Sequence, residues 1–403
     1  MPNRPQRPAD NDKPGPEYYK KLSGKRATPV PTDNDKPGQE YYDAYNARPS
    51  GISAAADLAM SRRKFIWGAL VVAGIGAAGY PLLKEVNMGT EGKELMANYE
   101  KIPAASDRHL YILKQVAANN MPGTWNNWVT IKAKGSKGTE VEFETSPHGL
   151  RVGTDNDWIE VPLDGPHAMA AAEIKGCTLP TYWMTEQIFQ QAKKTGGLVN
   201  FYNDGVIAND PDIKGTLGVD WNALSQDGKN AFKQNPAMAR ARNVLVKRWM
   251  KDHNISDDQL TSCGFKEIVQ PVAGLTTTRA KQISFLGHSF TYGKGKSNRL
   301  EICGGCYVSE KGGAKQVQPF SGGHHVDIYY DYSHLVRFVK PEIQVNGKAM
   351  SFSEFFNNSE YALEFGFQAS PVPERAYRYT PELAKYMSEN GYLRSPLTAE
   401  DNK

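Results

Sequence analysis

The sequence predicts an α+β fold: a single large mixed domain that follows a disordered N-terminal tail and one apolar signal or anchor helix. Two observations lead to this prediction. Helical and strand patterns interleave between residues 87 and 375 without a regular strand–helix–strand period. The chain, at 403 residues, also has room for one large domain or two ordinary ones. The formal net charge is only +4, so the concentrated basic surface of a nucleic-acid-binding protein is not expected.

Residues 1–60 predict a disordered tail, because nine prolines, many charges and few aliphatic side chains leave too little apolar surface to bury. A ten-residue unit at 10–19 returns almost unchanged at 33–42. Either the two copies bind a cytoplasmic partner through their paired tyrosines, or they are a duplicated linker. The candidate partner-binding residues are Tyr18, Tyr19, Tyr41 and Tyr42.

Residues 61–84 predict an export signal or a membrane anchor. Two arginines and a lysine at 62–64 precede nineteen uncharged residues at 65–83, just enough to span a bilayer. Four glycines and Pro81 make this run only moderately apolar, and the pattern resembles a twin-arginine signal. We therefore expect the twin-arginine translocase as a partner, with the following domain in the cell envelope, on the periplasmic side of the cytoplasmic membrane. Translation from Met60 and a plain anchor remain alternatives.

The domain at 87–375 carries both kinds of periodicity. Apolar residues at helical spacing predict three helices, and short alternating or β-branched runs predict strands. Residues 376–403 are polar and are expected to form an extension over the surface. The expected helices cover 107–119, 185–194 and 236–252, and the expected strands cover 128–132, 140–143, 159–161, 282–286, 300–308 and 326–330.

Histidines concentrate near the end of this domain, since four of the eight fall between residues 288 and 334. On an extended strand, His325, Asp327 and Asp331 would share one face. Imidazole and carboxylate groups on one face are suited to binding a divalent metal such as zinc. His325 and Asp327 are therefore the candidate metal ligands.

The same region offers an acid–base centre. His288, Asp331 and His334 would suit hydrolysis of an ester, amide or glycosidic bond, provided that burial shifts their pKa values. Ser333 and Arg337 are the candidate substrate-binding residues. The alternative is structural: these side chains cap turns, and Arg337 pairs with Asp331.

The four cysteines leave the disulfide pattern open. Cys303 and Cys306 form a lone Cys-x-x-Cys motif within an expected strand, which favours buried thiols or a structural bridge over a redox site. The two others are Cys177 and Cys263.

Several segments between 145 and 345 resemble a group of uncharacterised exported bacterial proteins that carry a twin-arginine signal. The resemblance lies in the segments 146–155 and 176–181, then in Gly-His at 287–288, Gln-Pro-Phe at 318–320 and Asp-Tyr-Ser-His at 331–334. It implies export, a one-domain body, and a shared centre at His288 and the Asp-Tyr-Ser-His turn. It implies no particular reaction.

Together these features predict an exported or membrane-anchored hydrolase that acts on a cell-wall or other extracellular polymer through a His/Asp site. The rival hypothesis is a non-enzymatic anchored protein whose outer domain binds glycan or protein while its tail repeats recruit a cytoplasmic partner.

Overall fold

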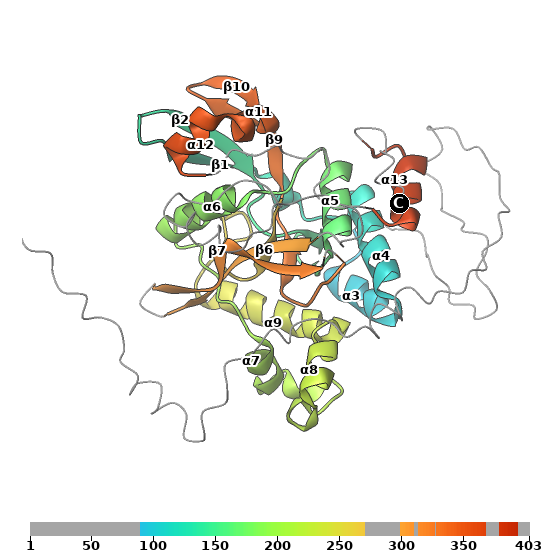
Figure 1. Cartoon of the computed structure of the whole chain (residues 1–403). Helices are drawn as coiled ribbons and strands as arrows, with labels where there is room; N and C mark the ends of the chain where they lie inside the picture. Colours follow the sequence, from blue (N-terminus) through green and yellow to red (C-terminus); the bar gives the residue numbers. More distant parts are fainter. Residues whose placement is uncertain (1–88, 271–298, 310–312, 327, 368–378, 394–403) are drawn as a thin grey trace, which may run out of the picture. The chain divides into compact units, whose positions relative to one another are not determined.

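A computed structural model describes residues 89–270, 299–309, 313–326, 328–367 and 379–393 (Figure 1). The chain divides into two compact units, 1–51 and 52–403, and all described residues belong to the second. The predicted tail with its four tyrosines, the signal at 61–84, the strand at 282–286, His288 and Asp327 lie outside the described residues. Among the helices that are described, none has the length and apolar character needed to cross a membrane.

The α+β prediction is confirmed, because helices and sheets mix within one unit. The helices are α3 (Gly92–Lys101), α4 (Ala105–Ala117), α5 (Gly165–Ile174), α6 (Tyr182–Lys194), α7 (Asp204–Asn209), α8 (Gln226–Phe232), α9 (Pro236–Asp252), α11 (Phe352–Asn357), α12 (Ser359–Phe365) and α13 (Pro381–Glu389). The strands are β1 (Val129–Lys134), β2 (Glu140–Thr145), β3 (Arg151–Gly153), β4 (Trp158–Glu160), β5 (Lys266–Ile268), β6 (Arg299–Val308), β7 (Ala314–Val326), β8 (His334–Val336), β9 (Val339–Val345) and β10 (Lys348–Ser351).

The strands form three sheets. An antiparallel sheet has the order β1-β2-β9-β10, and β3 pairs with β4 in a small antiparallel ribbon. The third sheet has the order β7-β6-β5-β8, in which only the β5–β8 pair is parallel. Strands far apart in sequence therefore become neighbours, and β8 lies buried beside β5 at one edge of the third sheet.

Local sequence explains where the main helices begin. The three predicted helices correspond to α4, α6 and α9. The side chain of Thr181 accepts a hydrogen bond from Met184 N at the start of α6, and that of Asn235 accepts one from Ala237 N at the start of α9. A side chain that satisfies a first-turn N–H favours initiation at that residue. Pro236 reinforces it, because proline suits the first helical position.

One hydrophobic core packs α3, α4 and α5 against β3 and β4. The C-terminal helix α13 belongs to this core as well, through buried Leu383, Ala384 and Met387. Within the predicted polar extension 376–403, residues 381–389 thus form a helix that packs one face on this core. The apolar residues of α13 recur every three or four positions, which buries one face of a short helix despite its polar composition.

The expected strand at 326–330 is also wrong. β7 ends at Val326, and residues 328–333 form no strand. The carboxylate of Asp331 accepts hydrogen bonds from the backbone N and the Oγ of Ser333, at 2.8 and 2.5 Å. This local turn competes with strand pairing, as short polar side chains often do. Asp331 is consequently not part of the strand that contains His325.

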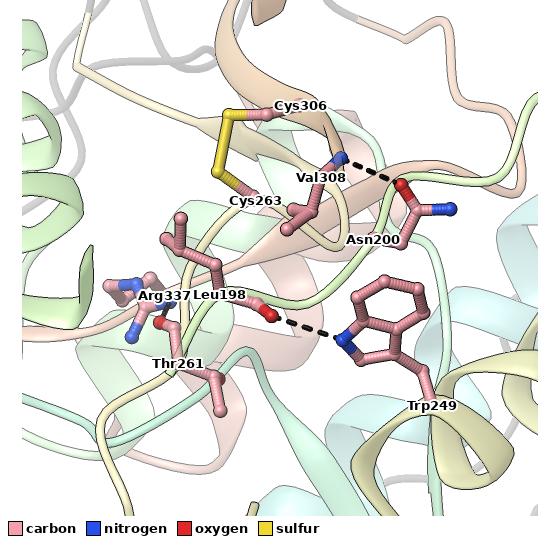
Figure 2. The surroundings of a disulfide bond; sticks show 8 residues. All are labelled: Leu198, Asn200, Trp249, Thr261, Cys263, Cys306, Val308 and Arg337. Carbon is pink, nitrogen blue, oxygen red and sulfur yellow. Dashed lines mark hydrogen bonds between the residues drawn. A yellow bond between two sulfur atoms is a disulfide. The ribbon is translucent and has the colours of Figure 1, made fainter. Parts of the chain in front are cut away.

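One disulfide lies among the described residues, and it joins Cys263 to Cys306 (Figure 2). The Cys-x-x-Cys motif is therefore not bridged within itself, and Cys303 is a buried thiol. The structural bridge is one of the alternatives predicted from sequence. Figure 2 also shows Arg337, whose Nη2 donates to Thr261 O at 2.7 Å.

Candidate metal centre

His109, Asp164 and His167 form a buried cluster of metal-ligating side chains. One ligand atom from each residue lies within 4.8 Å of the others. The side chains are almost without solvent contact, since the residues are 1%, 2% and 3% exposed. The described residues thus contain a compact set of two imidazoles and one carboxylate.

The sequence places two of these residues through the start of α5. Asp164 is the N-cap of the helix, and its Oδ1 accepts the backbone N–H of His167 at 2.9 Å. An N-cap and the third residue of the helix lie on the same side of the first turn, so an Asp-x-x-His sequence brings the two side chains together. The alanine-rich remainder of α5 lets it approach α4, which contributes His109.

The carboxylate of Asp164 bridges the two rings. Its Oδ2 is 3.2 Å from His109 Nδ1, and its Oδ1 is 2.7 Å from His167 Nδ1. An ionised carboxylate only accepts hydrogen bonds, so both Nδ1 atoms donate to Asp164. His109 Nε2 has no hydrogen-bond partner among the described residues. The two Nδ1 atoms and the carboxylate thus face one another, and a metal ion bound among them would replace the shared protons and take both rings and Asp164 as ligands.

Electrostatics favour the deprotonated forms of Asp164 and His109. Burial alone would raise the pKa of Asp164, but the charges of His167 and His109 and their hydrogen bonds together hold this pKa well below its ordinary value. Burial lowers the pKa of His109, although Asp164 opposes the shift. At neutral pH the cluster therefore presents a carboxylate beside a neutral His109 ring. Divalent metals bind these deprotonated forms.

Buried aromatic and basic side chains surround the cluster. The ring of Tyr330 meets the ring of His109 edge to face, with centroids 4.5 Å apart, and that of His167 meets it with centroids 5.0 Å apart. Arg108, next to His109 on α4, donates from Nη2 to the hydroxyl of Tyr330 at 2.6 Å. Tyr330 comes from the segment before the Asp-Tyr-Ser-His turn, so the two regions meet here.

The predicted acid–base pair is close but buried. His334 Nε2 lies 3.7 Å from Asp331 Oδ2, and the two residues are 0% and 5% exposed. Burial acts to raise the pKa of Asp331, but His334, Lys266 and the hydrogen bonds from Ser333 hold it well below its ordinary value. Ser333 is itself buried and its hydroxyl donates to Asp331. These contacts stabilise the turn.

Arg337 does not pair with Asp331, so this part of the structural alternative is wrong. Its Nε donates to Glu267 at 2.8 Å, its Nη1 to Ser146 O at 2.8 Å, and its Nη2 to Thr261 O at 2.7 Å. Residue 337 follows β8, and β8 pairs with β5, which carries Glu267. The parallel pairing of β5 and β8 is therefore the reason for the change of partner.

Neither of the predicted metal ligands, His325 and Asp327, is among the three residues of this cluster. His325 lies on β7 opposite Leu300, while its side chain, Asp327 and His288 lie outside the described residues. Sequence reasoning missed His109, Asp164 and His167. Asp164 and His167 had a readable signal, an N-cap motif before an apolar helix with a proline in its first turn. His109 had none.

Comparisons with protein families, with curated proteins and with solved structures found no match for this chain. Its function is therefore argued from the chemistry of the site and from the sequence features described above.

Proposed function

We propose that this chain is a metal-dependent hydrolase of the bacterial cell envelope, with a divalent metal such as zinc held by His109, Asp164 and His167. The observation that carries the proposal is the convergence of three ligand atoms within 4.8 Å in a buried site. Two imidazole nitrogens and a carboxylate oxygen suit zinc and similar ions better than calcium or magnesium, which prefer oxygen ligands alone.

The number of ligands favours catalysis over a purely structural role. Structural zinc sites use four protein ligands, whereas catalytic ones use three and leave a position for water or substrate. A divalent ion in such a site polarises a carbonyl or phosphoryl oxygen and lowers the pKa of a water molecule. The chain itself orients the two rings through the carboxylate of Asp164 and fixes the positive charge of Arg108 beside them.

Export of the domain is proposed from two features. The segment at 61–84 resembles a twin-arginine signal, which serves proteins that fold before they leave the cytoplasm. A protein that loads its metal before export benefits from this route, because the cytoplasm controls which metal is available. The Cys263–Cys306 disulfide supports a final location in an oxidising compartment. A cell-wall or other extracellular polymer is the substrate class that such a location offers.

The experiment uses the full chain, produced with its signal in a bacterial host and recovered from the envelope. Purified protein is analysed for bound metal by mass spectrometry and incubated with purified cell-wall sacculi. We expect one divalent ion per chain and release of soluble wall fragments. Asp164→Asn should lose both, while His253→Gln, on an exposed residue, should keep both.

Two results would contradict parts of the proposal. Wild-type protein without metal would overturn the metal centre. Protein with metal, but without release of fragments from any polymer tested, would leave a metal-stabilised envelope protein and favour the non-enzymatic alternative, in which the domain binds a ligand and the tail recruits a partner.

A further inference from the structure

Tyr330 covers the His109 side of the cluster from a part of the chain that belongs to neither helix of the site. Asp164 and His167 come from the start of α5, and His109 comes from α4. Tyr330 lies four residues after the end of β7, outside helices and strands, and it is 1% exposed. Its ring packs edge to face on His109, whose Nε2 is the buried nitrogen without a hydrogen-bond partner among the described residues.

Two hydrogen bonds hold Tyr330 in this position. Its hydroxyl accepts from Arg108 Nη2 at 2.6 Å and donates to the backbone oxygen of Gln234 at 3.3 Å. Arg108 is fixed in turn, since its Nη1 donates to the carbonyl oxygens of Ile102 and Pro103, both at 2.9 Å. The Tyr330 hydroxyl is therefore bonded both to the backbone at Gln234 and to Arg108 of α4.

The segment behind Tyr330 is held by a separate local device. Asp331 accepts from Ser333, and His334 begins β8 in the sheet. A change in the side chain of Tyr330 alone leaves this turn intact. The hydrogen bonds that hold the Tyr330 side chain are therefore distinct from those that hold the turn at Asp331.

We infer that Tyr330, tethered by Arg108, is the gate of the metal centre: substrate and metal reach His109 when the phenol swings away, and the site is closed when it is bound to Arg108. This inference rests on the proposed function and adds its regulation. The cluster is almost fully buried, whereas the proposed substrate is an external polymer. Opening at Tyr330 would give that substrate access to the cluster. Opening requires the loss of the two hydrogen bonds of the phenol and of its packing on His109, but of no hydrogen bond in the turn at Asp331.

The test is Tyr330→Phe, which keeps the ring over His109 and removes the hydroxyl tether. The matched control is Tyr307→Phe, which removes a hydroxyl from an exposed tyrosine that accepts a hydrogen bond from Asn203 far from the cluster. Access to His109 is measured directly, as the rate at which diethyl pyrocarbonate modifies it in metal-free protein, read by peptide mass spectrometry. The release of zinc to a chelator is measured in parallel in loaded protein.

A hydrogen bond to a charged donor contributes enough that its loss should raise the open fraction about tenfold to a hundredfold. We therefore expect both rates to rise by about that factor in Tyr330→Phe and to stay at the wild-type value in Tyr307→Phe. His148 is an internal control, because it is as buried as His109 but belongs to the loop before β3. Its modification rate should not change.

An unchanged rate at His109 overturns the gate, and so does an equal rise at His148, since that rise reports general loosening of the fold. The outcome is separable from that of the proposed function. Wild-type protein that binds no metal removes the metal centre, but the modification rates in metal-free protein still decide whether Tyr330 controls access to His109.

Discussion

Replacing Arg337 with methionine is predicted to destabilise the fold strongly, although sequence alone makes this residue a candidate for substrate binding. The side chain is 0% exposed and donates to the carboxylate of Glu267 and to two carbonyl oxygens. Methionine fills much of the same volume but leaves the charge of Glu267 buried and unpaired. Removing one partner of a buried ion pair costs about 3–5 kcal/mol, a large fraction of the roughly 5–15 kcal/mol that stabilises a domain.

The assay is equilibrium unfolding in urea, followed by circular dichroism with the disulfide intact. Arg240→Met is the matched control, because Arg240 pairs with Glu100 at 2.7 Å in a half-exposed position where an ion pair contributes under about 1 kcal/mol. The double change Arg337→Met with Glu267→Gln should recover part of the loss, since it removes the stranded charge. A stable Arg337→Met protein that equals Arg240→Met in unfolding but no longer binds the polymer would refute the structural role.

Two further predictions concern the disulfide and a buried histidine. Cys263→Ser should lower the unfolding free energy by about 4 kcal/mol, the chain-entropy value for opening a loop of this size, because the bridged residues are 43 positions apart; a urea midpoint equal to that of the wild type would contradict this. His148 should make the fold sensitive to acid. Burial and the charges of Arg151 and Arg337 hold the pKa of His148 well below its ordinary value in the folded chain. As the pH falls through about 6.5, only the unfolded chain therefore takes up a proton at this residue. Stability is therefore lost on acidification, and thermal melting between pH 8 and 5 should fall less steeply in His148→Gln than in the wild type or in the exposed-site variant His253→Gln; parallel slopes for all three would oppose this account.

Helices were the part of the fold most open to prediction from sequence. The 3.6-residue period of apolar side chains identified α4, α6 and α9, because each buries one face. The segment 326–330 failed for a local reason. Its alternating apolar residues resemble a strand, but Asp331 bonds the backbone of Ser333, and Tyr330 is drawn to Arg108 on a helix more than two hundred residues away in sequence.

The candidate site was harder to predict, because residues that are close in sequence need not be close in the folded structure. The histidines between 288 and 334 drew attention through their spacing, yet His334 became a buried member of a turn. His109 and Asp164 are 55 residues apart, and only the packing of α4 on α5 joins them. A single sequence contains no signal for a contact between residues so far apart. The Asp-x-x-His sequence at 164–167 indicates at most the start of a helix, and α5 was not among the predicted helices.

The most direct test of the metal centre is a zinc titration of the metal-free full chain, followed by calorimetry. We predict one site per chain in the wild type. The double variant His109→Ala with His167→Ala should lose this site, and His148→Gln, which changes a buried histidine outside the cluster, should retain it. Equal zinc binding by the wild type and the double variant, or no binding by the wild type, would contradict the assignment of His109, Asp164 and His167 as the metal centre.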